Sequence, residues 1–158
     1  MNIKKTALEF LLDPERLTAV IGSSPLDGNT HTATVYYFVD NEFNFYFLTA
    51  TGTQKYRNLL ENKNAAIVVG FGPSYTTVQG QGVATLLNKD SAEEREAIAH
   101  IKHRLLNNGD KTWPIFQIDA FEDQSIAVFR FTPATLQLMN LEQNNGLPIT
   151  AAETLQIL

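Results

Sequence analysis

The chain has 158 residues, no cysteine and a formal net charge of −5, with 44% hydrophobic and 18% charged residues. These values suit one globular domain with a substantial core, residues 1–158, and they exclude disulfides, thiolate metal sites and a cysteine nucleophile. The charge is acidic, no stretch of roughly 18 residues is apolar enough for a membrane span, and no cleavable signal peptide is evident, so we expect a cytoplasmic protein with no nucleic acid or membrane partner.

Short runs rich in Val, Ile, Thr, Phe and Tyr alternate with turn residues along the chain, which is typical of β-strands. The second and third of these runs form a hairpin, and the alternation of Phe43, Phe45 and Phe47 indicates one buried face. Gly80 and Gly82, inside the fifth run, mark a bulge or the close approach of another backbone or a ligand. We predict strands over residues 17–21, 32–39, 43–49, 65–70, 76–87 and 125–141.

Local signals at helix starts and ends predict the helices between these strands. The expected helices are one opened by a Thr6–Glu9 capping box and ended by Asp13-Pro14, one that follows Lys55 and ends near Asn64, one opened by a Ser91–Glu94 capping box and ended by Asn108-Gly109, and a short terminal one capped by Thr150–Glu153. The predicted fold is mainly β (α+β), an antiparallel six-stranded split β-barrel with flanking helices.

The segment Thr51–Lys55 combines the groups that hold a phosphate monoester. Thr51, Thr53 and Gln54 supply short hydrogen-bond donors, and the glycine between the two threonines lets backbone amides approach an anion. Lys55 supplies a positive charge at the start of a helix, whose free amides and dipole favour an anion. The alternative is an ordinary helix cap followed by a solvated surface lysine.

Three patterns, in this order and spacing, resemble the pyridoxamine 5'-phosphate oxidase-like superfamily over roughly residues 6–140. They are Thr32-Ala-Thr-Val35 at the start of a strand, Phe47-Leu-Thr-Ala-Thr-Gly-Thr-Gln-Lys55 followed by Asn58-Leu59 and Asn62, and Val78-x-Gly80-x-Gly82-x-Ala84 followed by Phe129-Arg-Phe-Thr-Pro133. The resemblance implies a homodimer of split barrels that holds two FMN molecules at the subunit interface. It also implies an FMN-dependent oxidoreductase acting on a small-molecule substrate.

The resemblance further assigns FMN contacts to individual residues. It implies that the first half of the second strand lies against the flavin ring, largely through its backbone. It places the ribityl chain and phosphate on the segment that ends at Lys55. The residues implied are Thr32, Ala33, Thr34 and Val35 for the ring, Thr49, Thr53, Gln54 and Lys55 for the ribityl phosphate, Thr77 for the pyrimidine edge, and Trp113 for a substrate pocket, with apolar packing as the alternative for Trp113.

Two departures from the family pattern limit the expected function. Where the family often has an arginine before the phosphate-binding lysine, this chain has Gln54. Arg57, one helical step away, either compensates for that arginine or faces solvent. The oxidases of the family carry an Arg-x-His element near the C-terminus for their substrate, whereas the last third of this chain has Arg130 and no histidine. We therefore do not expect authentic pyridoxamine phosphate oxidation.

Other chemistries have less support in the sequence. His100 and His103 are three residues apart on a predicted helix and His31 is distant, so we expect no metal site. Glu93, Glu94 and Glu96 are interpreted as a solvated helix start, and no catalytic residue stands out. The competing functions are a non-enzymatic flavin-binding or sensing protein and a relative that binds haem or a deazaflavin.

Overall fold

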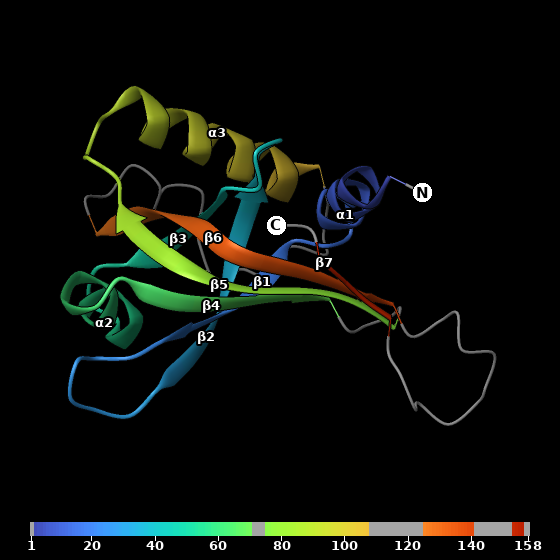
Figure 1. Cartoon of the computed structure of the whole chain (residues 1–158). Helices are drawn as coiled ribbons and strands as arrows, with labels where there is room; N and C mark the ends of the chain where they lie inside the picture. The colour runs from blue at the N-terminus through green and yellow to red at the C-terminus, as the bar shows by residue number, and fades with distance from the viewer. Residues whose placement is uncertain (1, 71–74, 108–124, 141–152, 157–158) are drawn as a thin grey trace.

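The computed structural model describes residues 2–70, 75–107, 125–140 and 153–156. Its centre is a closed antiparallel barrel in the order β3-β2-β1-β4-β5-β6, in which β6 pairs back with β3, and β7 extends the far end of β6 (Figure 1). The elements are α1 (Ile3–Leu11), β1 (Thr18–Ser23), β2 (His31–Val39), β3 (Phe45–Ala50), α2 (Gln54–Glu61), β4 (Asn64–Gly70), β5 (Thr76–Leu86), α3 (Ala92–Leu106), β6 (Ile126–Asn140) and β7 (Glu153–Gln156). The predicted fold class is confirmed.

The barrel interior is filled by aromatic side chains from β3 and β6. Phe45 pairs in register with Phe131, and Phe47 with Phe129, and all four side chains are fully buried. Their rings meet at centroid distances of 6.1 and 5.6 Å, which suits favourable aromatic contacts. Phe43 is also buried, although it precedes β3. The predicted phenylalanine stripe is therefore part of the core.

The barrel is split between β2 and β3. These strands pair only from Tyr37 to Val39 on β2, opposite Phe45 to Phe47 on β3. Beyond that point β3 continues along β6 alone, and residues 31–36 of β2 are paired with β1 alone. One backbone edge of the first half of β2 is therefore without a strand partner among the described residues.

The three helices cover the barrel in different places. In Figure 1, α3 lies along one side of the barrel, and α1 and α2 lie towards opposite ends. Arg104 on α3 donates hydrogen bonds to the carbonyls of Leu11, Leu12 and Arg16, and thereby holds the end of α1. At the other end, α2 contacts β1, β2, β3 and β5, and so lies beside the opening between β2 and β3.

Two helix predictions are wrong. The first helix begins at Ile3, because the side chain of Asn2 caps it and accepts a hydrogen bond from the Lys5 amide at 3.2 Å. Thr6 instead lies within that helix. At the other end of the chain, residues 153–156 form β7 and not a helix, since pairing with residues 137–140 of β6 overrides the local capping pattern. The Ser91 cap is confirmed, with its hydroxyl accepting from the Glu94 amide at 3.1 Å.

Candidate functional site

The turn between β3 and α2 is fixed by two threonines. Thr53 is the N-cap of α2: its hydroxyl oxygen accepts from the Tyr56 amide and donates to the Ala50 carbonyl at 2.8 Å. The Thr49 hydroxyl lies 2.9 Å from that of Thr53, and the Thr49 side chain is fully buried. Thr49 therefore stabilises the turn from the barrel interior, and its side chain presents no surface to a ligand.

The start of α2 combines free donors with an uncompensated charge. The amides of Gln54 and Lys55 belong to the first helical turn and find no acceptor among the described residues. Lys55 is half-buried, and burial lowers its pKa. Within the described part of the chain its ammonium group has no ion pair or hydrogen bond. Space is also open above Gly52. These features fit an anion such as a phosphate.

Gln54 is not a free donor but a bridge between two neighbours. Its Nε2 donates to Asn58 Oδ1 at 2.7 Å, and its Oε1 accepts from Arg57 Nη2 at 2.9 Å. Arg57 Nη1 donates to the Gly52 carbonyl, also at 2.9 Å. The guanidinium thus spans the turn at the start of α2. The open question left by the sequence is answered in part: Arg57 is exposed, but it is held against this turn.

Asn58 links the start of α2 to the barrel. It is 1% exposed, and its Nδ2 donates to the Ser23 hydroxyl, itself buried at the end of β1, at 3.3 Å. The sequence interpretation did not identify Asn58 or Ser23 as part of the site. The spacing of four residues between Gln54 and Asn58 was the available signal, because side chains at that separation meet on one face of a helix.

The predicted ring-contacting segment lies at the open edge of β2. The side chains of Thr32 and Thr34 are exposed, that of Ala33 is partly exposed, and that of Val35 is buried in the core. Val35 can therefore meet a ligand only through its backbone. Because β3 has separated from β2 here, backbone groups along this edge have no strand partner in the described part of the chain.

Thr32 and Thr34 also belong to an uncharged outer face of the barrel. In register across β2, β1, β4 and β5, one row of this face is Thr34, Val20, Val68 and Gln79, and the next row is Thr32, Gly22, Ala66 and Gln81. None of these eight residues is ionisable. Val20 and Val68, which pair in register, are 41% and 39% exposed.

A shallow groove of about 470 Å³ continues this outer face towards β6. The groove lies beside the point where the pairing of β5 with β6 shifts register, between Gln81 and Gly82. A side chain at Gly82 would collide with the backbone of Thr132 and Pro133, so the predicted bulge and close backbone approach are confirmed. The lining residues are Gly22, Ser23, Ser24, Thr30, Asn64, Ala65, Ala66, Gln81, Gly82, Val83, Ala134 and Thr135.

Thr77 lies apart from the other predicted residues within one chain. It pairs with Gly70 at the end of β4, and β4 and β1 separate its strand from β2 in the sheet. Its side chain is 5% exposed, and its hydroxyl donates to the Val69 carbonyl at 3.0 Å. Any further bond to this hydroxyl must therefore use it as an acceptor. Trp113 lies outside the described residues.

The histidines do not form a metal site in the described part of the chain. His100 stacks on Phe38 with ring centroids 4.2 Å apart, and its Nε2 lies 3.8 Å from a carboxylate oxygen of Glu96. His103 bonds Asn107 on the same helix. No group of three or more His, Cys, Asp or Glu side chains within residues 2–70, 75–107, 125–140 and 153–156 is arranged to hold a metal ion.

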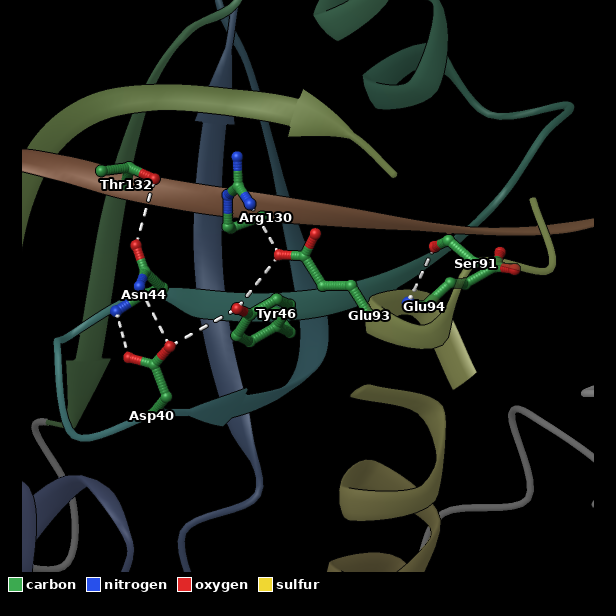
Figure 2. Close-up of polar contacts among 8 residues, drawn as sticks. All are labelled: Asp40, Asn44, Tyr46, Ser91, Glu93, Glu94, Arg130 and Thr132. Atoms are coloured by element: carbon green, nitrogen blue, oxygen red, sulfur yellow. Dashed lines mark hydrogen bonds and ion pairs between the residues drawn. The ribbon is translucent and has the colours of Figure 1, made fainter. Parts of the chain in front are cut away.

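A second polar cluster joins α3 to the barrel (Figure 2). Glu93 accepts a hydrogen bond from Arg130 Nη1 at 2.6 Å. The Tyr46 hydroxyl lies 3.3 Å from Glu93 Oε1 and 3.4 Å from Asp40 Oδ2, so its one proton is shared between two carboxylates. Burial, together with the two carboxylates, raises the pKa of Tyr46 to about 12. The cluster lies at the start of β3, whereas α2 follows its end. We assign it a structural role.

The interpretation of Glu93, Glu94 and Glu96 as a solvated helix start is confirmed for Glu96, whose side chain is 76% exposed, holds in part for Glu93, at 41%, and is wrong for Glu94. Glu93 pairs with Arg130, and Glu94 is 2% exposed. One carboxylate oxygen of Glu94 accepts from the Asp90 amide at 2.6 Å, and the other lies 3.6 Å from Lys89 Nζ. Glu93 and Glu94 are thus held by partners that the local sequence does not identify.

The barrel has an opening between β2 and β3 and, beside that opening, a helix start whose donors and charge suit an anion, and this arrangement defines a split barrel. The family described as Pyridoxamine 5'-phosphate oxidase matches residues 3–140, and the chain belongs to this family. The resemblance found in the sequence is confirmed. No curated protein matches the chain. In the described residues, no helix is long and apolar enough to cross a membrane.

Solved structures share the fold at low sequence identity. HutZ, the haem storage protein from Vibrio cholerae, aligns with a TM-score of 0.69 and 19% identity over 86% of this chain and 94% of its own. General Stress Protein 26 from Bacillus anthracis aligns at 0.62 and 15%, over 87% and 94%. A pyridoxamine 5'-phosphate oxidase-related, FMN-binding protein from Nostoc punctiforme aligns at 0.56 and 18%, over 87% and 81%.

Proposed function

We propose that the protein binds FMN and acts as an FMN-dependent oxidoreductase on a small molecule, without being an authentic pyridoxamine phosphate oxidase. The observation that carries this proposal is Lys55, a half-buried cation with no partner among the described residues at the start of α2. The family and its FMN-binding relative from Nostoc punctiforme support FMN as the anion that satisfies it.

The FMN phosphate is assigned to the start of α2. Lys55 supplies the charge, the amides of Gln54 and Lys55 supply donors, and the open space above Gly52 lets the phosphate approach the backbone. Thr53 keeps this turn in place through its bond to Ala50. Thr49 contributes by holding Thr53, since its own side chain is buried.

The flavin ring is assigned to the open edge of β2. Backbone groups of residues 32–35 are available there, and the short side chains of Thr32, Ala33 and Thr34 allow a flat ring to approach. Thr77 is kept as a candidate for the pyrimidine edge, where its hydroxyl would act as an acceptor because it already donates to Val69.

We further propose a homodimer that pairs the uncharged outer faces of two barrels. The face is apolar at Val20 and Val68, carries no charge in the two rows described above, and includes the ring-contacting Thr32 and Thr34. A groove as open as the one beside Gly82 would become a deep cleft once a second subunit covered it. Two-fold symmetry would create two equivalent FMN sites.

FMN, when bound, would supply the hydride or electron transfer chemistry. The chain would bind the phosphate, orient the ring through backbone groups and exclude water at the subunit interface. No side chain needs to act as an acid or base, which suits the lack of a predicted catalytic cluster. The Arg-x-His element that the family's oxidases use for pyridoxamine phosphate has no counterpart in the last third of this chain, which has Arg130 and no histidine.

The absorption spectrum of the purified full-length protein tests this proposal, followed by titration with FMN. A flavin spectrum, and rapid bleaching by NADH or NADPH in the absence of oxygen, would support the oxidoreductase. Bound flavin without reduction or turnover would instead indicate a flavin-binding or sensing protein. A Soret band after haem addition, with no FMN binding, would refute the FMN assignment and favour the haem-binding alternative, for which HutZ is the precedent within the fold.

A further inference from the structure

We infer that Arg57 supplies the second positive charge for the phosphate of the bound ligand, and that Gln54 is the positioning residue that holds it there. This inference rests on the proposed FMN function. It concerns how this chain recognises the phosphate, in the absence of an arginine directly before Lys55.

The first support is the placement of the guanidinium. Arg57 lies one turn into α2, and because helical side chains lean towards the N-terminus, its guanidinium can reach back over the first turn. Here it donates to the Gly52 carbonyl and to Gln54 Oε1, both at 2.9 Å, and so folds back across the turn that precedes Lys55. A guanidinium has five N–H donors, so these two bonds leave others free for an anion.

The second support is that Gln54 is itself fixed. Its Nε2 donates to the buried Asn58, which in turn donates to Ser23 on β1. With its amide nitrogen anchored to the barrel, Gln54 offers its oxygen to Arg57 in one orientation. The residue that replaces the usual arginine thus neutralises no phosphate charge itself, but it holds an arginine that can.

The third support is the local charge balance. A phosphate monoester carries a charge of about −1.5 to −2 near neutral pH, which one lysine does not neutralise. Neither Arg57 nor Lys55 has a carboxylate partner in the described part of the chain. Two cations without acidic partners therefore flank one helix start, which matches the charge of the ligand.

Binding titrations with FMN and riboflavin test this inference, because only FMN has the phosphate. We expect Arg57→Gln to weaken FMN about 3- to 10-fold and to leave riboflavin unchanged. Lys63→Gln is the matched control: it removes the same charge from an exposed position beyond the end of α2, and it should change neither affinity by that amount. Arg57→Lys should retain part of the wild-type preference for FMN, since lysine keeps the positive charge but lacks the paired N–H donors of the guanidinium.

Gln54 is tested by a double-mutant cycle. Gln54→Leu should reduce the preference for FMN when Arg57 is present and have little further effect in Arg57→Gln protein. Combining Gln54→Arg with Arg57→Gln should restore the preference, because it moves the cation to the position before Lys55. Circular dichroism spectra establish that each variant is folded.

The outcomes separate this inference from the proposed function. If wild-type protein prefers FMN over riboflavin and Arg57→Gln loses no more of that preference than Lys63→Gln, the role of Arg57 is wrong and the FMN assignment stands. If wild-type protein binds neither flavin, both proposals fail. Equal losses of FMN and riboflavin affinity in Arg57→Gln would also contradict the inference, since they would show a structural effect.

Discussion

The guanidinium of Arg130 lies 2.6 Å from a carboxylate oxygen of Glu93 and thereby joins β6 to the first turn of α3 (Figure 2). Both side chains are partly exposed, so the pair contributes modestly, by about 1 kcal/mol or less. We expect Glu93→Gln to lower the free energy of unfolding by that amount in low salt and by less in high salt. Urea denaturation at two salt concentrations measures it, with the exposed Glu42→Gln as control. Equal effects of both substitutions would contradict the assignment.

The Tyr46 hydroxyl is predicted to ionise at a higher pH than an ordinary tyrosine. Its pKa is raised to about 12, from an ordinary value near 10, by burial and by Asp40 and Glu93. The folded state holds this proton more tightly than the unfolded state, so the stabilisation is complete below about pH 10 and is lost as the pH rises towards 12. Tyr46→Phe should remove one tyrosinate absorbance step near pH 12 and make the decline in stability shallower. An unchanged titration curve in the variant would contradict the shift.

Lys55 is expected to contribute to FMN binding through the phosphate. Losing a charge-assisted hydrogen bond costs roughly 1.5–3 kcal/mol, so Lys55→Ala should weaken FMN about 10- to 100-fold. Riboflavin should bind wild type and variant almost equally. Quenching of flavin fluorescence measures both affinities. If riboflavin binding falls as much as FMN binding, Lys55 does not contact the phosphate.

The fold could be predicted from the sequence further than the site could. Alternation along the strands is local, so the buried stripe of Phe45 and Phe47 was predictable. The opening between β2 and β3 was not, because it depends on where these two strands stop pairing, at Tyr37 on β2 and Phe47 on β3, and the alternation pattern runs on past both residues. Residues 153–156 likewise form a strand because they pair with β6, although the capping pattern at Thr150–Glu153 favours a helix.

The site shows the same limit in its polar contacts. The residues proposed to bind the phosphate are consecutive from Gly52 to Lys55, so their chemistry could be predicted from the sequence. The hydrogen bond from Asn58 to Ser23 could not, since Ser23 lies 35 residues earlier in the chain. Side chains that lie far apart in the sequence and meet only through the barrel account for most of what was missed.

FMN affinity should decrease at alkaline pH. Burial lowers the pKa of Lys55 below the ordinary lysine value of about 10.4, and a bound phosphate favours the charged form. Binding therefore takes up a proton once the pH exceeds the pKa of Lys55 in the free protein, and affinity declines above that point. Wild-type titrations from neutral pH to about pH 10 should show this decline, and Lys55→Ala should not. The same slope in both proteins would mean that another group is responsible.

The last prediction concerns the uncharged outer face of β1, β2, β4 and β5. Val20 and Val68 are neighbours in register on this face, and both are exposed in one chain. If two copies pair there, Val68→Glu buries a negative charge from each subunit in the interface, and the two rows of this face hold no cation to pair with it. We expect this variant to become monomeric and to lose FMN affinity, while it remains folded.

Light scattering across micromolar dilution measures the association, and FMN titration follows on the same samples. Leu60→Glu is the matched control, because Leu60 is an exposed apolar residue on α2, at 52%, away from this face. It should leave the dimer intact. A monomeric wild-type protein that binds one FMN per chain at full affinity would contradict the interface site. A dimer unaffected by Val68→Glu would place the interface on another face.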